Sequence, residues 1–227
     1  MKTIPTILSR LIWKESQKVT REVVTGRLRS REEPRKGRFM PSDVGRILDR
    51  AQSNIDDLQS STVAQDSWAN FRMVFLGLTH LAIYRALLNE GTKKDYATDL
   101  IGDIAWKTVT ESRRTKIGKS IIRLITGDPH KQLGMQLRFL GRFATSPPGY
   151  ESELSSDADA HYWDFYRCPP LEFYRTQGEE ALEMFRNTWC KIDFATAEWM
   201  AKGAKYERPH TLSEGDDVCD MRWYVGR

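Results

Sequence analysis

The chain contains 227 residues, of which 40% are hydrophobic and 29% are charged. This composition excludes an intrinsically disordered chain and is typical of a soluble globular protein. The length is somewhat long for one average domain and short for two. We therefore expect one domain over residues 42–227, preceded by a basic N-terminal extension and linker over residues 1–41.

The N-terminal extension holds the positive charge of the chain. Residues 1–38 contain eleven Lys and Arg against four Glu, a net charge of +7, so the remaining residues sum to −3 within a total of +4. Apolar residues of the extension recur at helical spacing and predict one apolar stripe on an amphipathic helix. These residues are Ile4, Ile7, Leu8, Leu11 and Ile12.

We expect this apolar stripe to pack on the body of the protein or on a second subunit, which leaves a homo-oligomer open. A peripheral contact of residues 1–38 with an anionic membrane surface is the alternative. Nucleic acid is not an expected partner, because the extension has no DNA- or RNA-binding motif. The N-terminus also lacks a long apolar stretch and a small-residue cleavage site, so we expect a cytoplasmic protein.

Apolar spacing predicts helices along most of the chain that follows the extension. The longest apolar run is broken by Arg72, His80 and Arg85, so it indicates a buried helix and not a membrane span. We expect the third helix to be interrupted near Gly118. Residues 29–43 form a charged linker, and Ser42 is the expected cap of the helix that follows. The predicted helices cover residues 42–59, 66–89, 95–126 and 129–143.

The sequence changes character at residues 144–160, which are polar, rich in Ser and Pro, and predict no regular element. The aromatic run HYWDFYR that follows favours a strand ended by Pro169 and Pro170. Residues 171–203 predict one or two helices, and the tail predicts an antiparallel hairpin turning at residues 214–216. The expected fold class is therefore α+β, a helical layer packed on a small antiparallel sheet formed mainly by the C-terminal third.

Three cysteines, Cys168, Cys190 and Cys219, lie in the last sixty residues. The chain has no phosphate-binding glycine loop, no G-x-S-x-G turn and no H-E-x-x-H motif, so these thiols are the main candidates for chemistry. An odd number of cysteines in a cytoplasmic protein indicates free thiols or metal ligands. Packing in the core is the alternative for each of them.

The spacing of the neighbouring charged residues suggests two groupings. On a helix, Cys190 and Asp193 share a face, so the carboxylate could take the thiol proton or bind a metal with it. On a strand, Cys219 points to one face while Asp220 and Arg222 point to the other. These two could pair with each other or hold a carboxylate ligand.

Zinc is the metal that these cysteine and histidine side chains could bind. Three thiolates with His161 or His210 would provide enough ligands, but the paired spacing of structural zinc sites is missing. We therefore expect no resident metal and no other cofactor, with zinc as the alternative.

The order of three motifs carries a family resemblance. RCPP (residues 167–170), CKID (residues 190–193) and ERPHTLSEGDDVCDMRW (residues 207–223) together resemble the L-2-amino-thiazoline-4-carboxylic acid hydrolase family. The similarity covers residues 42–227 and is specific from His161 onward. It implies hydrolytic opening of a small cyclic amidine that bears a carboxylate, giving a carbamoylated cysteine.

The resemblance also implies roles for individual residues. Cys190 and Asp193 would be the nucleophile or base pair, and a cation would hold the carboxylate of the small-molecule substrate. Met221 departs from the aromatic residue usual after the family's Cys-Asp pair. The expected catalytic residues are Cys190, Asp193 and Cys168, and the expected substrate-binding residues are Arg167, Cys219, Asp220 and Arg222, with Arg222 or Arg167 as the cation.

Two other functional classes stay open at this point. One is a non-catalytic module that binds a small molecule or a metal, with the basic extension as its anchor. The other is a related isomerase, cyclase or lyase of biosynthetic metabolism, since function resides in the site and not in the fold.

Overall fold

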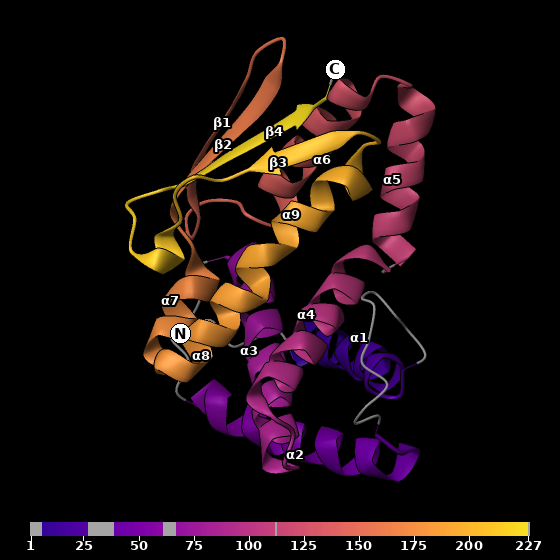
Figure 1. The fold of residues 1–227 in the computed structure, drawn as a ribbon, viewed down its shortest axis with the longest axis vertical. Coiled ribbons are helices and arrows are strands. Elements are labelled where there is room, and N and C mark those ends of the chain that lie inside the picture. The colour runs from indigo at the N-terminus through magenta and orange to yellow at the C-terminus, as the bar shows by residue number, and fades with distance from the viewer. Residues whose placement is uncertain (1–5, 27–38, 61–66, 112, 227) are drawn as a thin grey trace. The chain divides into compact units, whose positions relative to one another are not determined.

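The structure, a computed structural model, describes residues 6–26, 39–60, 67–111 and 113–226. The fold is α+β, as the sequence predicts: helices dominate, and a four-stranded antiparallel sheet lies in the C-terminal part (Figure 1). The chain forms two compact units, each described here by itself. Unit 1 comprises Met1–Ala64 and Val74–Glu111, and unit 2 comprises Gln65–Met73 and Ser112–Arg227. The domain boundary expected at residue 42 stays a prediction.

Unit 1 is helical. It contains α1 (Thr6–Val24), α2 (Pro41–Ser60), α4 (Lys94–Thr110) and most of α3 (Trp68–Asn89). The apolar positions predicted for α2 form its buried face, because Ile47, Leu48 and Ile55 recur at helical spacing and are almost fully buried. Helix α1 packs against α4 and α2.

The structure buries only part of the predicted stripe on α1. Ile7 and Leu11 are 75% and 58% exposed, Leu8 and Ile12 are half-buried, and Val19 and Val23, nearer the C-terminal end of the helix, are buried. Helix α1 is therefore most deeply buried against the other helices of unit 1 along its second half, where the valines lie. Ile4 and residues 29–38 of the predicted linker lie outside the described residues.

Helix α3 is long and apolar enough to cross a membrane by length and composition alone. However, 78% of its apolar window is buried inside the structure, as in the core helix of a globular unit. Its hydrophobic residues lie all around the helix, which is typical of an element covered on every side. The expectation of a buried helix agrees with this placement.

Helix α5 (Arg113–Ile125) corrects one prediction. The helical stretch expected to break near Gly118 ends earlier, where α4 stops at Thr110 with Glu111 as its C-cap, and Gly118 lies inside α5. One glycine costs at most about 1 kcal/mol in a helix, which its neighbours outweigh. Helix α6 (Pro129–Phe143) follows the predicted bounds, with Asp128 accepting hydrogen bonds from the His130 and Lys131 N–H groups as its N-cap.

The sheet has the strand order β1-β2-β4-β3 and is antiparallel throughout. Its strands are β1 (Glu151–Ser156), β2 (Ala160–Arg167), β3 (Ala204–Glu207) and β4 (Cys219–Val225). Strand β1 lies in the segment expected to be irregular, so that prediction was wrong. Its polar residues are nearly all exposed, and backbone pairing with β2 makes it a strand in spite of its composition.

Helices α6 and α9 (Trp189–Met200) pack on one face of this sheet, called here the inner face (Figure 1). The inner face includes His161, Trp163 and Trp223, all buried. Helix α6 comes so close that a Cβ added at Gly134 would lie 2.5 Å from the His161 ring. Only glycine permits this approach, which fixes α6 against β2.

Between β2 and β3 the chain forms three helices where one or two were expected: α7 (Pro169–Thr176), α8 (Glu179–Asn187) and α9. Gly178, at φ 95°, separates α7 from α8, and Thr188 separates α8 from α9. The break at Thr188 matters because Cys190 follows it immediately. The predicted hairpin is present as β3 and β4, joined by a loop that contains the short 3-10 helix η1 (Leu212–Glu214).

Candidate functional site

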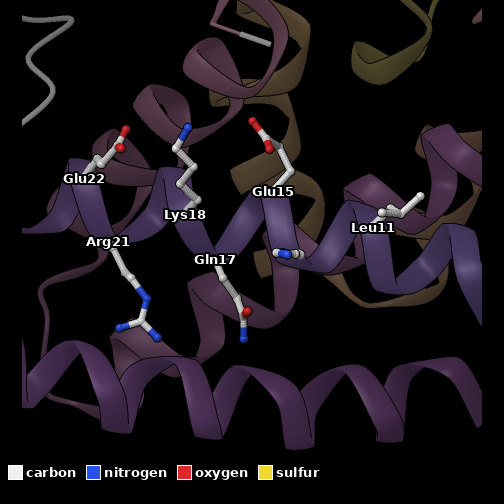
Figure 2. A pocket seen from close by; sticks show the side chains of 7 residues that line it. Leu11, Glu15, Gln17, Lys18, Arg21 and Glu22 are labelled. Carbon is white, nitrogen blue, oxygen red and sulfur yellow. The ribbon is translucent and has the colours of Figure 1, made fainter. Parts of the chain in front are cut away.

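A shallow hollow runs along α1, but its residues do not form a site. All of its lining residues come from this one helix. Figure 2 shows Glu15 and Lys18 on one side of α1 and Arg21 on the other, so the charged groups do not converge on one bound molecule.

The structure brings the three thiols and one carboxylate into one region, called here the cysteine cluster: Cys168, Cys190, Cys219 and Asp193. Cys168 caps the start of α7, Cys190 and Asp193 lie one turn apart on α9, and Cys219 begins β4. Charge on the other three groups would raise the pKa of the Cys168 thiol further, in addition to burial. Three elements separate in sequence, α7, α9 and β4, therefore bring these four groups into one region.

A chain of hydroxyl groups connects two of the thiols. The Cys190 Sγ donates to the Ser213 Oγ at 3.4 Å. The Thr211 Oγ1 lies 3.4 Å from the Ser213 Oγ and 3.4 Å from the Cys219 Sγ. The Leu212 N–H also donates to the Cys219 Sγ at 3.3 Å. The thiols are thus held by polar groups and not only by apolar packing.

Two arginines from the neighbouring helices hold the loop that carries these hydroxyls. The Arg175 Nη2 donates to the Leu212 carbonyl at 2.8 Å, and the Arg186 Nε donates to the Ser213 carbonyl at 2.7 Å. Charged donors make stronger hydrogen bonds than neutral ones. These two bonds therefore fix η1, and with it the Ser213 hydroxyl, beside Cys190.

Asp193 and Arg208 form the charged part of the site. The Arg208 Nη1 lies 3.5 Å from the Asp193 Oδ2, and its Nη2 donates to the Cys190 carbonyl at 2.7 Å. The surrounding protein partly shields the Asp193 carboxylate from water, and this desolvation raises its pKa to about 6. The positive charge of Arg208 limits the rise. The Asp193 side chain keeps 32% of its surface exposed, so water can reach the carboxylate.

The thiol of Cys190, unlike the Asp193 carboxyl group, keeps its proton at neutral pH. Burial raises its pKa to about 12, even though the hydrogen bond with Ser213 and the charge of Arg208 act to lower it. A thiol with this pKa is protonated at neutral pH. Cys190 can therefore donate a hydrogen bond, but it is a weak nucleophile in this setting.

Tyr206 adds a polar group that the sequence did not single out. It lies on the inner face of β3, is only 8% exposed, and packs against Trp223 and Phe194. Its hydroxyl is buried, with no hydrogen-bond partner among the described residues. Its pKa is raised by burial and by the charge of Asp193, which places the hydroxyl near the carboxylate. A buried polar group without a partner calls for an explanation, such as contact with a bound ligand.

Two of the predicted substrate-binding residues lie away from the cysteine cluster. Asp220 and Arg222 point to the outer face of the sheet, where Asp220 accepts hydrogen bonds from the His210 N–H and ring, and Arg222 lies 3.7 Å from Glu207. The structure thus separates both from the Cys219 thiol, because neighbours on a strand alternate faces. Their substrate-binding roles stay predictions.

Arg167 is already paired in the structure. Its Nε and Nη2 donate to the two carboxylate oxygens of Glu172 at 2.7 and 3.1 Å, a two-pronged geometry that uses the fork of the guanidinium. The family resemblance implied Arg222 or Arg167 as the cation that holds the substrate carboxylate, and this role stays a prediction. The structure places a third cation, Arg208, beside Asp193. Strand alternation through Ala204, Tyr206 and Arg208 could have indicated that Arg208 shares their face.

The histidines raised as zinc ligands lie apart from the thiols. The His161 ring stacks on His130 at 4.2 Å, with its Nε2 3.0 Å from the His130 carbonyl, and His210 pairs with Asp220. Within the described part of the chain, no three His, Cys, Asp or Glu side chains are grouped so that they could hold a metal ion. The absence of a resident metal stays an expectation.

Comparison with known proteins identifies one family. Residues 71–223, two thirds of the chain, match the family model described as L-2-amino-thiazoline-4-carboxylic acid hydrolase. No curated protein and no solved structure matches the chain. The matched range contains the whole cysteine cluster, together with Tyr206 and Arg208.

Proposed function

Because the chain belongs to the L-2-amino-thiazoline-4-carboxylic acid hydrolase family, we propose that it hydrolyses a small cyclic amidine that bears a carboxylate. L-2-amino-thiazoline-4-carboxylate is the first substrate to test, and a carbamoylated cysteine is its product. The observation that carries this proposal is the Asp193 carboxylate, which has a pKa of about 6 and lies beside a cation within the family region. A carboxylate in this range is suited to move protons near neutral pH.

In the proposed reaction, Asp193 accepts a proton from a water molecule as the water oxygen bonds to the amidine carbon. One ring bond to that carbon then breaks, and the protonated Asp193 gives its proton to the departing ring atom. The net change is the addition of one water to the substrate, and the carboxylate returns to its starting state. A single carboxyl group can serve both steps because its pKa lies close to the working pH.

Water is the favoured nucleophile over the Cys190 thiolate. The pKa of about 12 keeps this thiol protonated, so very little thiolate is present at neutral pH. We propose that Cys190 contributes a hydrogen bond and the shape of the site, with Cys168 and Cys219 beside it. Its backbone carbonyl also has a role, because it holds the Arg208 guanidinium in place.

Arg208 and Tyr206 are the proposed groups for orienting the substrate. A guanidinium has five N–H donors, and only two of its nitrogens are engaged with Cys190 and Asp193. The buried Tyr206 hydroxyl has no partner among the described residues and can donate to a polar substrate atom. A hydrogen bond to a charged group is worth about 1.5–3 kcal/mol, so Tyr206→Phe should lower kcat/KM roughly ten- to hundredfold.

The test is turnover of L-2-amino-thiazoline-4-carboxylate, followed by mass spectrometry in heavy-oxygen water. We expect a product that is heavier than the substrate by one labelled water. Asp193→Asn should abolish most of this activity. Asp164→Asn is the matched control, since Asp164 also has a raised pKa but lies on the outer face of the sheet, in register with Asp220. A folded protein with no turnover would contradict the proposed substrate.

The orienting residues are tested separately from the reaction. Tyr206→Phe should leave thermal stability unchanged or slightly higher, because it removes a buried hydroxyl that lacks a partner in the unliganded protein. Arg208→Gln and Arg222→Gln compare the two candidate cations. If Arg222→Gln raises KM and Arg208→Gln does not, the substrate carboxylate binds elsewhere than proposed.

A further inference from the structure

Helix α5 has an unusual charge distribution. Its thirteen residues, RRTKIGKSIIRLI, include five Lys and Arg and no Asp or Glu. Residues 113–143, which span α5 and α6, contain eight Lys and Arg and one acidic residue, Asp128. The sequence placed the basic charge only in the N-terminal extension, but the structure shows a second concentration of it on one helix pair of unit 2.

The same helix exposes an apolar face. Ile117, Ile121, Leu124 and Ile125 follow the spacing i, i+4, i+7 and i+8, so they share one side of α5, called here the α5 stripe. All four are exposed, Leu124 by 87% and Ile125 by 63%. A contiguous row of large apolar side chains on a surface indicates a contact with another molecule.

The α5 stripe faces away from the body of unit 2. The packed side of the helix is marked by Lys119, whose Nζ lies 4.2 Å from the centre of the Trp199 ring on α9. Helical geometry places Lys119 roughly opposite Ile117, Ile121 and Leu124. The stripe is therefore the side of α5 directed away from α9.

Exposed cations lie on the other side of α5. Lys116 and Arg123 are exposed and stand three residues before and four residues after Lys119, so they share its side of the helix and not that of the α5 stripe. Arg123 forms no ion pair within the described residues. An apolar stripe on one side and Lys and Arg on the other is the pattern of helices that lie in the interface of an anionic membrane.

We propose that α5 is a docking surface for an anionic lipid bilayer, with the α5 stripe inserted at the headgroup level and the exposed Lys116 and Arg123 attracted to the lipid phosphates. This surface is independent of the hydrolase site, which uses none of these residues. A second copy of the chain is disfavoured as the occupant, because two helices that each carry five Lys and Arg and no Asp or Glu repel each other.

Helix α5 suits a contact with anionic lipid better than α1, the described helix of the extension for which the sequence suggested this contact. The described part of the extension, α1, carries Glu15 and Glu22 among its basic residues, which weakens its attraction to anionic lipid. Helix α5 has no acid to offset its charge. The two helices can therefore be compared directly in one experiment.

The test is co-sedimentation of the full chain with vesicles of phosphatidylcholine, with and without phosphatidylglycerol. We expect binding only to the vesicles that contain phosphatidylglycerol, with weaker binding at high salt. Leu124→Ser should weaken the partition coefficient about tenfold, since a leucine leaves the membrane. Arg123→Gln should weaken it about fivefold, the effect of one cation near an anionic surface.

The control is Ile7→Ser, which removes a side chain of similar exposure from α1 and should leave binding unchanged. Thermal melts check that each variant stays folded, which is expected because Leu124, Arg123 and Ile7 are all exposed. Absence of binding, or equal binding to neutral vesicles, would overturn the proposal. So would loss of binding in Ile7→Ser alone, or a dimer that Leu124→Ser converts to a monomer.

Discussion

The pH dependence of hydrolysis tests the role of Asp193 most directly. Only the ionised carboxylate can accept the proton of the attacking water, so activity should rise with pH as Asp193 loses its own proton. With a pKa of about 6, the ionised fraction is ~0.1 at pH 5 and ~0.9 at pH 7. We therefore expect kcat/KM to increase about tenfold between these two pH values.

The ordinary aspartate pKa of 3.8 would give a different profile. In that case the carboxylate would already be almost fully ionised at pH 5, and activity would change by about a tenth or less up to pH 7. The size of the acidic limb thus reports the raised pKa that the structure assigns to Asp193. Steady-state kinetics over this range, with the folded state checked at each pH by circular dichroism, provides the measurement.

Two variants connect this limb to Asp193. Asp193→Asn should lower kcat by a factor of about 10²–10⁴, the usual contribution of a general base. Arg208→Gln removes the charge that lowers the pKa of Asp193, so its acidic limb should move to higher pH. The reasoning would be refuted by a flat profile in the wild type, or by a limb that moves in Asp164→Asn and not in Arg208→Gln.

We expect the Cys190 thiol to react with iodoacetamide at pH 8 at least about a hundredfold more slowly than in the unfolded chain, because its pKa is about 12; fast labelling would restore the thiolate route. The free energy of unfolding, measured in urea, should fall by about 1–3 kcal/mol in Gly134→Ala, because the added methyl group meets the His161 ring. It should rise by up to about 1 kcal/mol in Gly118→Ala, where the added methyl group has open space around it. Arg208→Gln should cost about 1–3 kcal/mol at pH 8 and less at pH 5, where Asp193 is largely protonated; a loss independent of pH would contradict their pairing.

Local sequence patterns predicted much of the fold. The apolar periodicity of α2 and α6 and the aromatic run of β2 specify elements by their own composition, and the structure has them near the expected residues. The predictions that failed depend on partners distant in sequence. Strand β1 exists because β2 supplies its hydrogen bonds, and the break beside Gly118 was misplaced because a glycine alone does not end a helix.

The features of the candidate site also divide into those that depend on local sequence and those that depend on tertiary contacts. The sequence by itself determined the residue types, the family motifs and the shared face of Cys190 and Asp193, since these depend on identity and on spacing within one helix. Only the tertiary structure decided which cation lies beside Asp193 and that the Cys190 thiol is protonated. Both depend on burial and on distances between α9 and the β3–β4 loop, because a pKa is set by the groups that folding brings around it and not by neighbours along the chain.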